Sequence, residues 1–108
     1  MTTSIHEFRL ARFGHDLLTR DRAAPVRAEL RREMEALESG GQLVVDMDGV
    51  GAITPSFADE LLGRLLLEVG ETTFRARIKL RTSDATVRLL VNRVLAQRAA
   101  EARGAGRP

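Results

Sequence analysis

The side chains that could do chemistry in this chain gather in one short central stretch. Asp46 and Asp48 directly follow the apolar run 43–45, and the Ser56 hydroxyl comes eight residues after Asp48. Two carboxylates at this spacing can act as a nucleophile and an acid/base around Mg²⁺, or they can accept hydrogen bonds from the amides of a tight loop. Gly49 supplies the backbone freedom that such a loop needs. We therefore expect a sharp turn after a buried strand.

Ser56 lies where a helix is expected to begin. Pro55 suits a first helical turn, and Ser56 followed three residues later by Asp59 matches the pattern of a helix N-cap. The free amides and the positive dipole end of a helix start also accommodate a phosphate or a partner's anion. Two interpretations of Ser56 stay open, a structural cap and a phosphoacceptor.

Few other residues suggest metal or thiol chemistry. The chain has no cysteine, which excludes disulfides, thiolate catalysis and cysteine-based metal sites. His6 and His15 have no third ligand at a suitable spacing, so we expect both to be surface imidazoles. The sequence predicts no metal ion and no cofactor.

The composition is that of one globular domain. Apolar residues make up 44% of the 108 residues and charged residues 30%. We expect a single domain over residues 1–108, with a frayed tail from about residue 99. No apolar run is long enough to span a bilayer, and the first residues lack a secretory apolar core. The expected location is therefore the cytoplasm, without membrane association.

The apolar spacing divides the chain into alternating strands and helices. We expect an edge strand over residues 4–13, with a bulge or a break where its alternation fails, and then a helix from 21–25 to 38. A central strand at 43–47, buried on both faces, is expected to lead into a helix at 57–69 that Gly70 ends. A strand at 71–83 and a last helix from 83 or 84 to 98 complete the predicted order. This order predicts an α/β fold with parallel strand pairs.

The charge is unevenly distributed along the chain. The net charge is +2, but residues 71–108 carry nine basic residues against three acids. Four basic residues alternate with apolar ones in the predicted strand and would form one basic face: Arg75, Arg77, Lys79 and Arg81. This face makes nucleic-acid binding an alternative function. The aromatic residue among them, Phe74, is expected to point inward, so no ring is placed to stack on a base, and a solvated basic face is favoured.

The run D-M-D-G-V after an apolar strand resembles the first motif of haloacid-dehalogenase-type phosphatases, and the strand ending at Thr82 resembles their second motif. That resemblance implies a Mg²⁺-dependent phosphatase with Asp46 as nucleophile and Asp48 as acid/base. Such an enzyme needs a later lysine and a further acidic pair. After Thr82 the chain has no lysine, and its only acids are Asp84 and Glu101. We therefore do not expect an enzyme and keep the phosphatase as the alternative.

A second resemblance covers nearly the whole chain. The segment D-M-D-G-V-G-A-I-T-P-S-F-A-D-E-L-L-G, followed by a strand and a terminal helix, resembles the STAS-like domain family of bacteria, which is related to the anti-sigma-factor antagonists. The resemblance implies a small mixed sheet with helices packed on one side. It also implies a functional loop before the helix that follows the central strand. In phosphorylatable members, a GHKL-type kinase phosphorylates a hydroxyl of an Asp-Ser-Ser-Gly loop.

On that pattern Ser56 takes the place of the second hydroxyl and is the phosphoacceptor candidate, while Thr54 replaces the acid, Pro55 the first Ser and Phe57 the Gly. The resemblance implies a non-enzymatic regulatory module that binds a protein partner, such as a GHKL-type kinase, through the loop and helix at 54–63. The expected contact residues are Thr54, Pro55, Ser56, Phe57, Asp59 and Glu60. Asp46, Asp48 and Gly49 are expected to support the loop.

Overall fold

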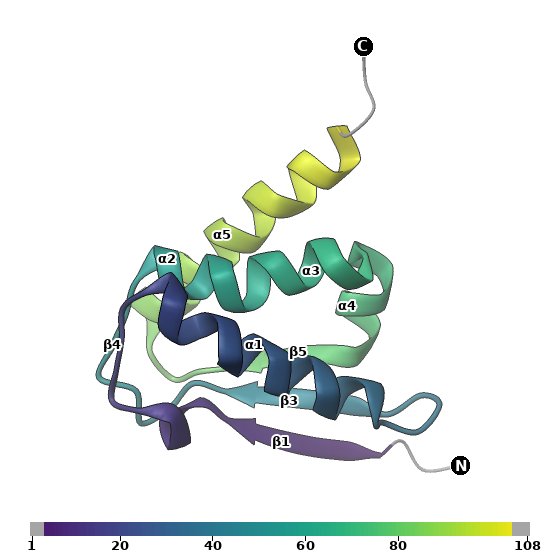
Figure 1. Ribbon diagram of the computed structural model, residues 1–108, viewed down its shortest axis with the longest axis horizontal. Helices are drawn as coiled ribbons and strands as arrows, with labels where there is room; N and C mark the ends of the chain where they lie inside the picture. The colour runs from purple at the N-terminus through teal and green to yellow at the C-terminus, as the bar shows by residue number, and fades with distance from the viewer. Residues whose placement is uncertain (1–3, 105–108) are drawn as a thin grey trace.

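A computed structural model describes residues 4–104 of the chain. In chain order its elements are β1 (Ile5–Arg9), the 3₁₀ turn η1 (Leu10–Phe13), β2 (Asp16–Leu17), α1 (Arg20–Glu35), β3 (Gln42–Asp46), β4 (Ala52–Ile53), α2 (Pro55–Ala58), the π turn η2 (Asp59–Gly63), α3 (Arg64–Val69), α4 (Glu71–Arg77), β5 (Ile78–Arg81) and α5 (Ala85–Gly104). Figure 1 shows β1, β3 and β5 as a lower layer and the helices above it.

The main sheet has three strands in the order β1-β3-β5, so the central strand of the sequence is also central in space. Phe8 pairs with Val45, and Val45 pairs with Leu80. A separate two-stranded ladder joins β2 to β4. Every strand pairing within residues 4–104 is parallel, as the alternation of strands and helices predicts.

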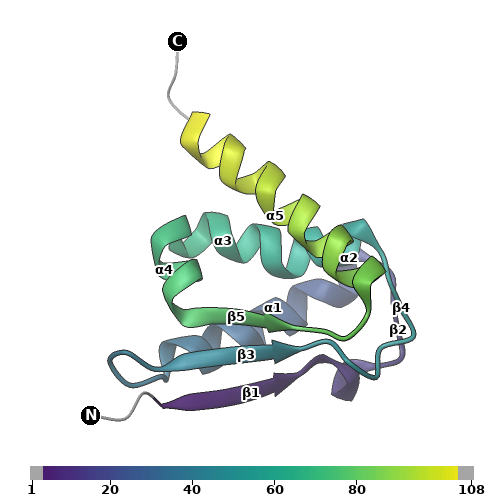
Figure 2. The same ribbon diagram turned by 180° about the vertical axis from the view of Figure 1, so that it is seen from behind.

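The helices pack on one side of this sheet (Figures 1 and 2). Leu43 and Val45 of β3 are buried, whereas Val44 between them is only half-buried. Successive side chains of a strand point to opposite faces, so Leu43 and Val45 mark the covered face and Val44 the open one. The prediction that the central strand is buried on both faces is therefore wrong at Val44, because within residues 4–104 no second layer of helices covers the sheet.

The predicted helix after the central strand is present and runs from Pro55 through η2 to Val69, where Gly70 ends it with a φ of 90°. Its buried side chains recur in pairs: Phe57 and Ala58, Leu61 and Leu62, and Leu65 and Leu66. A spacing of four residues drifts away from an α-helix of 3.6 residues per turn. The wider π turn at η2 compensates for part of this drift and keeps the pairs directed at the core.

Two segments that were predicted as strand are partly helical. The strand predicted at 4–13 breaks after Arg9 into η1, where Phe13 folds back to stack on Phe8 with ring centroids 5.4 Å apart. Residues 71–77 form α4 instead of a strand. Only Phe74 is buried in that segment, and Glu71 pairs with Arg75 one helical turn away at 2.8 Å.

The last helix is longer than predicted. Asp84 caps it, because its Oδ1 accepts hydrogen bonds from the amides of Thr86 at 2.8 Å and Val87 at 3.2 Å. Ala99 is buried, and Arg103 pairs with Glu71 of α4 at 2.6 Å. Residues 99–104 therefore belong to α5, and only residues 105–108 of the expected frayed tail lie outside the described part. Within residues 4–104, no helix combines the length and apolar character that crossing a membrane requires.

The helix at 55–69 gives a direct test of the packing. Leu65 is buried and its neighbour Arg64 is exposed. We expect Leu65→Ala to lower the free energy of unfolding by about 2 to 5 kcal/mol, since it leaves a cavity in the core. Arg64→Ala should change it by less than about 0.5 kcal/mol. Urea denaturation followed by circular dichroism measures both, and equal losses would mean that the buried face is wrongly assigned.

Candidate functional site

Thr54, and not Ser56, caps the helix that begins at Pro55. The Thr54 Oγ1 accepts a hydrogen bond from the Phe57 amide at 3.1 Å and donates one to the Leu18 carbonyl at 2.6 Å. The predicted cap at Ser56 is therefore wrong. The physical reason is Pro55, whose fixed φ and missing N–H favour the first helical position and so make the residue before it the cap.

Ser56 is exposed in the first turn of this helix. Its side chain borders a hollow of about 320 Å³ between the start of α2 and the middle of α5. The polar neighbours in this hollow are Arg20, Asp59, Gln97, Arg98 and Glu101. The Ser56 hydroxyl is thus accessible, with two guanidinium groups and two carboxylates around it.

Three of the residues predicted to contact a partner are turned inward. Phe57 is fully buried, so it supports the loop and does not offer its ring to a partner. Asp59 and Glu60, which were expected to contact a partner, are only 15% and 13% exposed in their side chains. The physical reason is ion pairing, because both carboxylates are held by arginines from other helices.

The Asp59 carboxylate joins three segments of the chain. Its Oδ1 lies 2.6 Å from Arg98 Nε and its Oδ2 lies 2.7 Å from Arg98 Nη2, a bidentate pair with α5. Arg20 at the start of α1 approaches the same Oδ2 to 2.8 Å. The hydrogen bonds from Arg98 and then Arg20 outweigh burial and lower the pKa of Asp59 to about 2. We call this set the Asp59 cluster.

Two further features support the Asp59 cluster. Glu60 pairs with Arg27 of α1 at 2.5 Å, and the hydrogen bond from Arg27 is the main reason for the lowered pKa of Glu60. Gly63 allows α5 to come close, since a Cβ added there would lie 2.9 Å from Arg98 Cγ and would also collide with the Asp59 carboxylate. Sequence reasoning missed Arg20 and Arg98, because ion pairs 39 residues apart leave no local pattern.

Asp46 and Asp48 both serve as hydrogen-bond acceptors in the loop. Asp46 Oδ1 accepts the Asp48 amide at 3.0 Å, and Asp46 Oδ2 accepts from Arg81 Nη2 at 2.9 Å. The bond from Arg81 is the largest cause of the lowered pKa of Asp46, followed by the bond from the Asp48 amide. Asp48 Oδ1 accepts both the amide and the hydroxyl of Ser83, at 2.7 and 2.9 Å. Gly49 takes a positive φ of 88° in the turn directly after Asp48.

Neither histidine belongs to the Asp59 cluster, although the His15 ring lies against Gly51 of the loop that follows β3. His6 is within 2.8 Å of the Ser4 hydroxyl, and His15 within 2.9 Å of the Asp16 carboxylate. Both side chains are exposed. Within residues 4–104, no group of three His, Cys, Asp or Glu side chains is placed to hold a metal ion.

The predicted basic strand face does not form. Arg75 and Arg77 lie on α4, and only Lys79 and Arg81 lie on β5. Arg77 donates to the carbonyl of Glu38 at 3.1 Å, and Arg81 pairs with Glu7 and Asp46. The residues that alternate in the sequence are therefore divided between two elements and engaged in separate contacts.

A second hollow, of about 330 Å³, adjoins the one beside Ser56. The two share Pro55, Val94 and Gln97, and the second adds Leu89, which is 61% exposed. Together they follow the side of α5 that faces the start of α2. We call this continuous surface the α2–α5 groove and define it by Pro55, Ser56, Leu89, Arg93, Val94 and Gln97.

The corrected cap can be tested with two substitutions. We expect Thr54→Ala to lower the free energy of unfolding by about 1 to 2 kcal/mol, because it removes the cap of the Phe57 amide. Ser56→Ala should change it by less than about 0.5 kcal/mol, because its side chain is exposed. Chemical denaturation of both variants under one condition gives the comparison, and a larger loss for Ser56→Ala would restore Ser56 as the cap.

The Asp59 cluster predicts a pH dependence. A carboxylate whose pKa falls from 3.8 to about 2 on folding stabilises the fold above pH 4, and this contribution is lost as the pH falls toward 2. The loss from this group should be about 2 kcal/mol. Denaturation between pH 7 and pH 2 should show Asp59→Asn to be less stable at neutral pH and to lose less stability in acid.

The matched control is Asp21→Asn, which changes an exposed carboxylate in the first turn of α1. This variant should keep the acid dependence of the unchanged chain. If Asp59→Asn and the unchanged chain lost the same stability in acid, the cluster would not be the source of the effect.

Comparison with known proteins agrees with this architecture. The family model described as a STAS-like domain of unknown function (DUF4325) matches residues 23–88, which run from α1 to the start of α5 and include the loop before α2. A search of curated proteins gave no match, and neither did a search of solved structures. Because the match covers more than half of the 108 residues, the chain belongs to the family of STAS-like domains.

Proposed function

We propose that this chain is a non-enzymatic regulatory module that docks a protein partner through the α2–α5 groove. The carrying observation is the exposed Ser56 hydroxyl, which lies in a groove whose apolar wall includes the 61% exposed Leu89. Apolar side chains beside polar, accessible ones are the usual composition of a protein-binding surface. Membership of the STAS-like family is compatible with a regulatory module.

The partner that we propose is a GHKL-type kinase or another regulatory ATPase, with the chain acting as an anti-sigma-factor antagonist. This proposal rests on the resemblance of the loop and on the accessibility of Ser56. A phosphate on Ser56 would add a charge of about −2 beside the carboxylates of Asp59 and Glu101. That charge would repel these carboxylates and compete with Asp59 for Arg98, so phosphorylation would weaken docking.

The geometry narrows the proposed contact region from 54–63 to its first residues and α5. Pro55 and Ser56 are exposed, whereas Phe57 is buried and Asp59 is paired with arginines. We therefore assign the direct contacts to Pro55 and Ser56. Phe57, Asp59 and Glu60 hold these contacts in place, as does Thr54 through its cap.

Neither alternative function gains support from the geometry. A phosphatase would need Asp46 as a free nucleophile, but its two carboxylate oxygens accept from Arg81 and from the Asp48 amide. Nucleic-acid binding was proposed for four basic residues on one strand face, and α4 and β5 divide them. A protein-binding module does not need Asp46 or these basic residues to be free, so their structural contacts are compatible with the proposed function.

Two exposed leucines provide a matched test of the docking surface. Leu89 lies in the α2–α5 groove, and Leu67, which is 40% exposed, lies on α3. Any GHKL-type ATPases encoded in the same genome would be purified as candidate partners and titrated by calorimetry. We expect one of these ATPases to bind the chain. Leu89→Lys should weaken this binding about tenfold or more, which is about 1.4 kcal/mol, and Leu67→Lys should leave it unchanged.

The same protein pair tests the switch. Incubation with ATP should place one phosphate on Ser56, detected by mass spectrometry, and Ser56→Asp should bind more weakly than Ser56→Ala. Phosphate on another residue would remove the switch but leave the docking surface. The absence of binding by every candidate ATPase would count against this partner class, and equal effects of the two leucine substitutions would count against the groove.

A further inference from the structure

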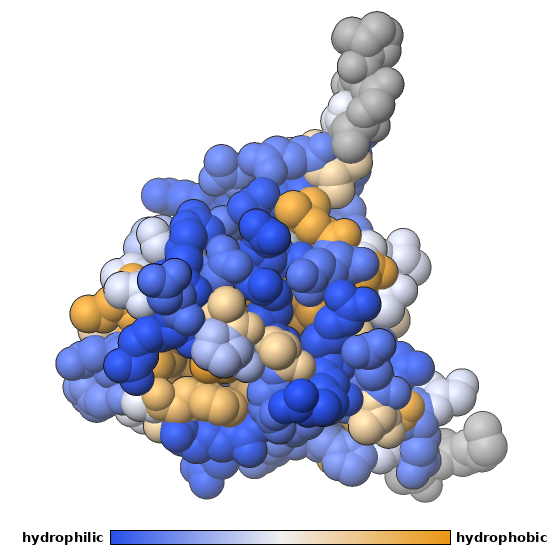
Figure 3. Space-filling model, in the orientation of Figure 1, coloured by the Kyte–Doolittle hydropathy of each residue, from blue (hydrophilic) through white to orange (hydrophobic). Residues whose placement is uncertain are grey.

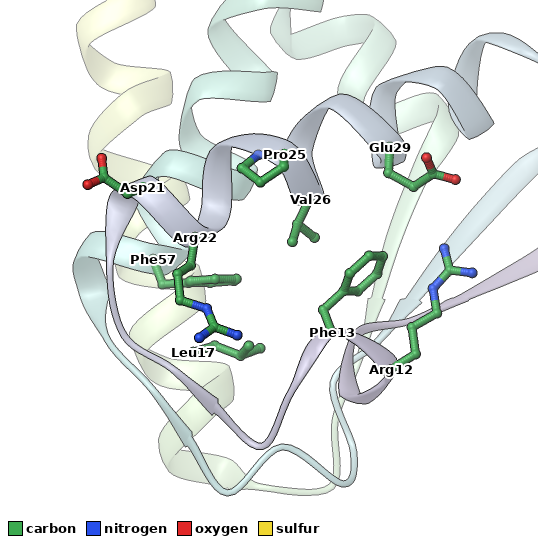
Figure 4. Close-up of a pocket in the computed structure, with 9 residues that line it drawn as sticks. All are labelled: Arg12, Phe13, Leu17, Asp21, Arg22, Pro25, Val26, Glu29 and Phe57. Carbon is green, nitrogen blue, oxygen red and sulfur yellow. The ribbon is translucent and has the colours of Figure 1, made fainter.

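A larger hollow borders the buried ring of Phe57. It has a volume of about 650 Å³ and is formed between η1, β2 and the first half of α1 (Figure 4). Its apolar lining consists of Phe13, Leu17, Pro25, Val26 and Phe57. Figure 3 shows hydrophobic surface over this part of the molecule, surrounded by hydrophilic residues. The volume and the aromatic and aliphatic walls are typical of sites for small molecules. We call it the α1 pocket.

Two of the charged side chains around the α1 pocket are already paired. Arg12 lies over the ring of Phe13, 4.7 Å from its centroid, and pairs with Glu33 at 2.7 Å. Glu29 pairs with Arg32 on the outer side of α1. These two residues therefore contribute little net charge to a ligand in the pocket.

The other two charged side chains differ in direction. Figure 4 shows the Asp21 carboxylate pointing away from the pocket and the Arg22 guanidinium reaching over Leu17 into its opening. Among residues 4–104, no carboxylate lies within ion-pairing distance of Arg22. The α1 pocket thus combines a buried apolar floor with one uncompensated cation at its mouth.

We propose that the α1 pocket binds a small amphiphilic anion, a molecule with an aromatic ring or a short hydrocarbon portion and one carboxylate. The apolar part would pack on Val26 and Phe57, and the carboxylate would accept a charge-assisted hydrogen bond from Arg22. An inorganic phosphate would leave the apolar floor uncovered, and a neutral hydrocarbon would leave Arg22 without a partner. The two features together select a ligand that is both apolar and anionic.

Such a ligand would contact the support of the docking loop. Both Phe57 and Leu17 line the α1 pocket. The Leu17 carbonyl also accepts a hydrogen bond from the Thr54 amide at 3.1 Å. Thr54 in turn caps the helix that carries Ser56. The proposed ligand site can be tested separately from the proposed function, because the test measures binding of a small molecule and needs no partner protein.

Two ligands of nearly the same shape, one anionic and one neutral, test the proposal. Indole-3-acetate and its neutral amide would be titrated into the ¹⁵N-labelled protein, with affinity measured from the shifts of backbone amide signals. We expect saturable shifts centred on Phe13, Leu17 and Val26 with the carboxylate, and at least tenfold weaker binding of the amide. One charge-assisted hydrogen bond accounts for a difference of this size.

Two arginine variants complete the test. Arg22→Gln should weaken binding of indole-3-acetate about tenfold while leaving the rest of the spectrum unchanged, because the side chain of Arg22 forms no ion pair within the described residues. Arg64→Gln, on the exposed side of α3, should have no effect. Equal affinity for the two ligands, shifts centred away from the α1 pocket, or no saturable binding would each overturn the proposal.

Discussion

The arrangement of the helices depends on one carboxylate, that of Asp59. It accepts hydrogen bonds from Arg98 of α5 and from Arg20 of α1, so three helices that are far apart in the sequence meet at one charge. The pair is largely withdrawn from water, with side-chain exposures of 15% for Asp59 and 23% for Arg98. Removal of one partner from such a pair leaves the other charge without compensation in a poorly solvated place, which is costly.

This interaction also positions the surface that we propose for docking. Arg98 fixes the middle of α5 beside η2, and Gly63 leaves the space for that approach. Val94 and Gln97, on the preceding turn of α5, are thereby placed next to Pro55 and Ser56. The groove is thus shaped by a tertiary ion pair, and the loop residues that carry the family resemblance form only one of its walls.

The sequence predicted the elements whose apolar residues recur with a regular period. The α1 stripe of Val26, Leu30 and Met34 is buried as expected, and so is the stripe of the helix at 55–69. The segment 71–77 was not predictable in this way, because its alternation of basic and apolar residues imitates a strand although Phe74 alone is buried. Burial of one residue in seven gives no period from which a helix could be recognised.

One part of the candidate site could be predicted from local sequence and another part could not. The cap at Thr54 was predictable, since a hydroxyl directly before a proline at a helix start is a stronger signal than the Ser-x-x-Asp pattern that begins two residues later. The Asp59 cluster was not, because its partners come from distant helices. The sequence shows that Asp59 and Glu60 are charged, but only the tertiary structure shows that both carboxylates are paired with arginines.

The two faces of the sheet differ, and both proposed sites lie on the side that the helices cover. Parallel sheets are usually covered on both faces. Here β1, β3 and β5 present charged side chains on the uncovered face, where Arg81 bridges Glu7 at 2.6 Å and Asp46 at 2.9 Å. This bridge ties all three strands together across the face that no helix of residues 4–104 covers. The ion pairs of Arg81 occupy part of that face, and the hollows that we propose for a partner and a ligand lie on the helical side, beside the helix that Thr54 caps.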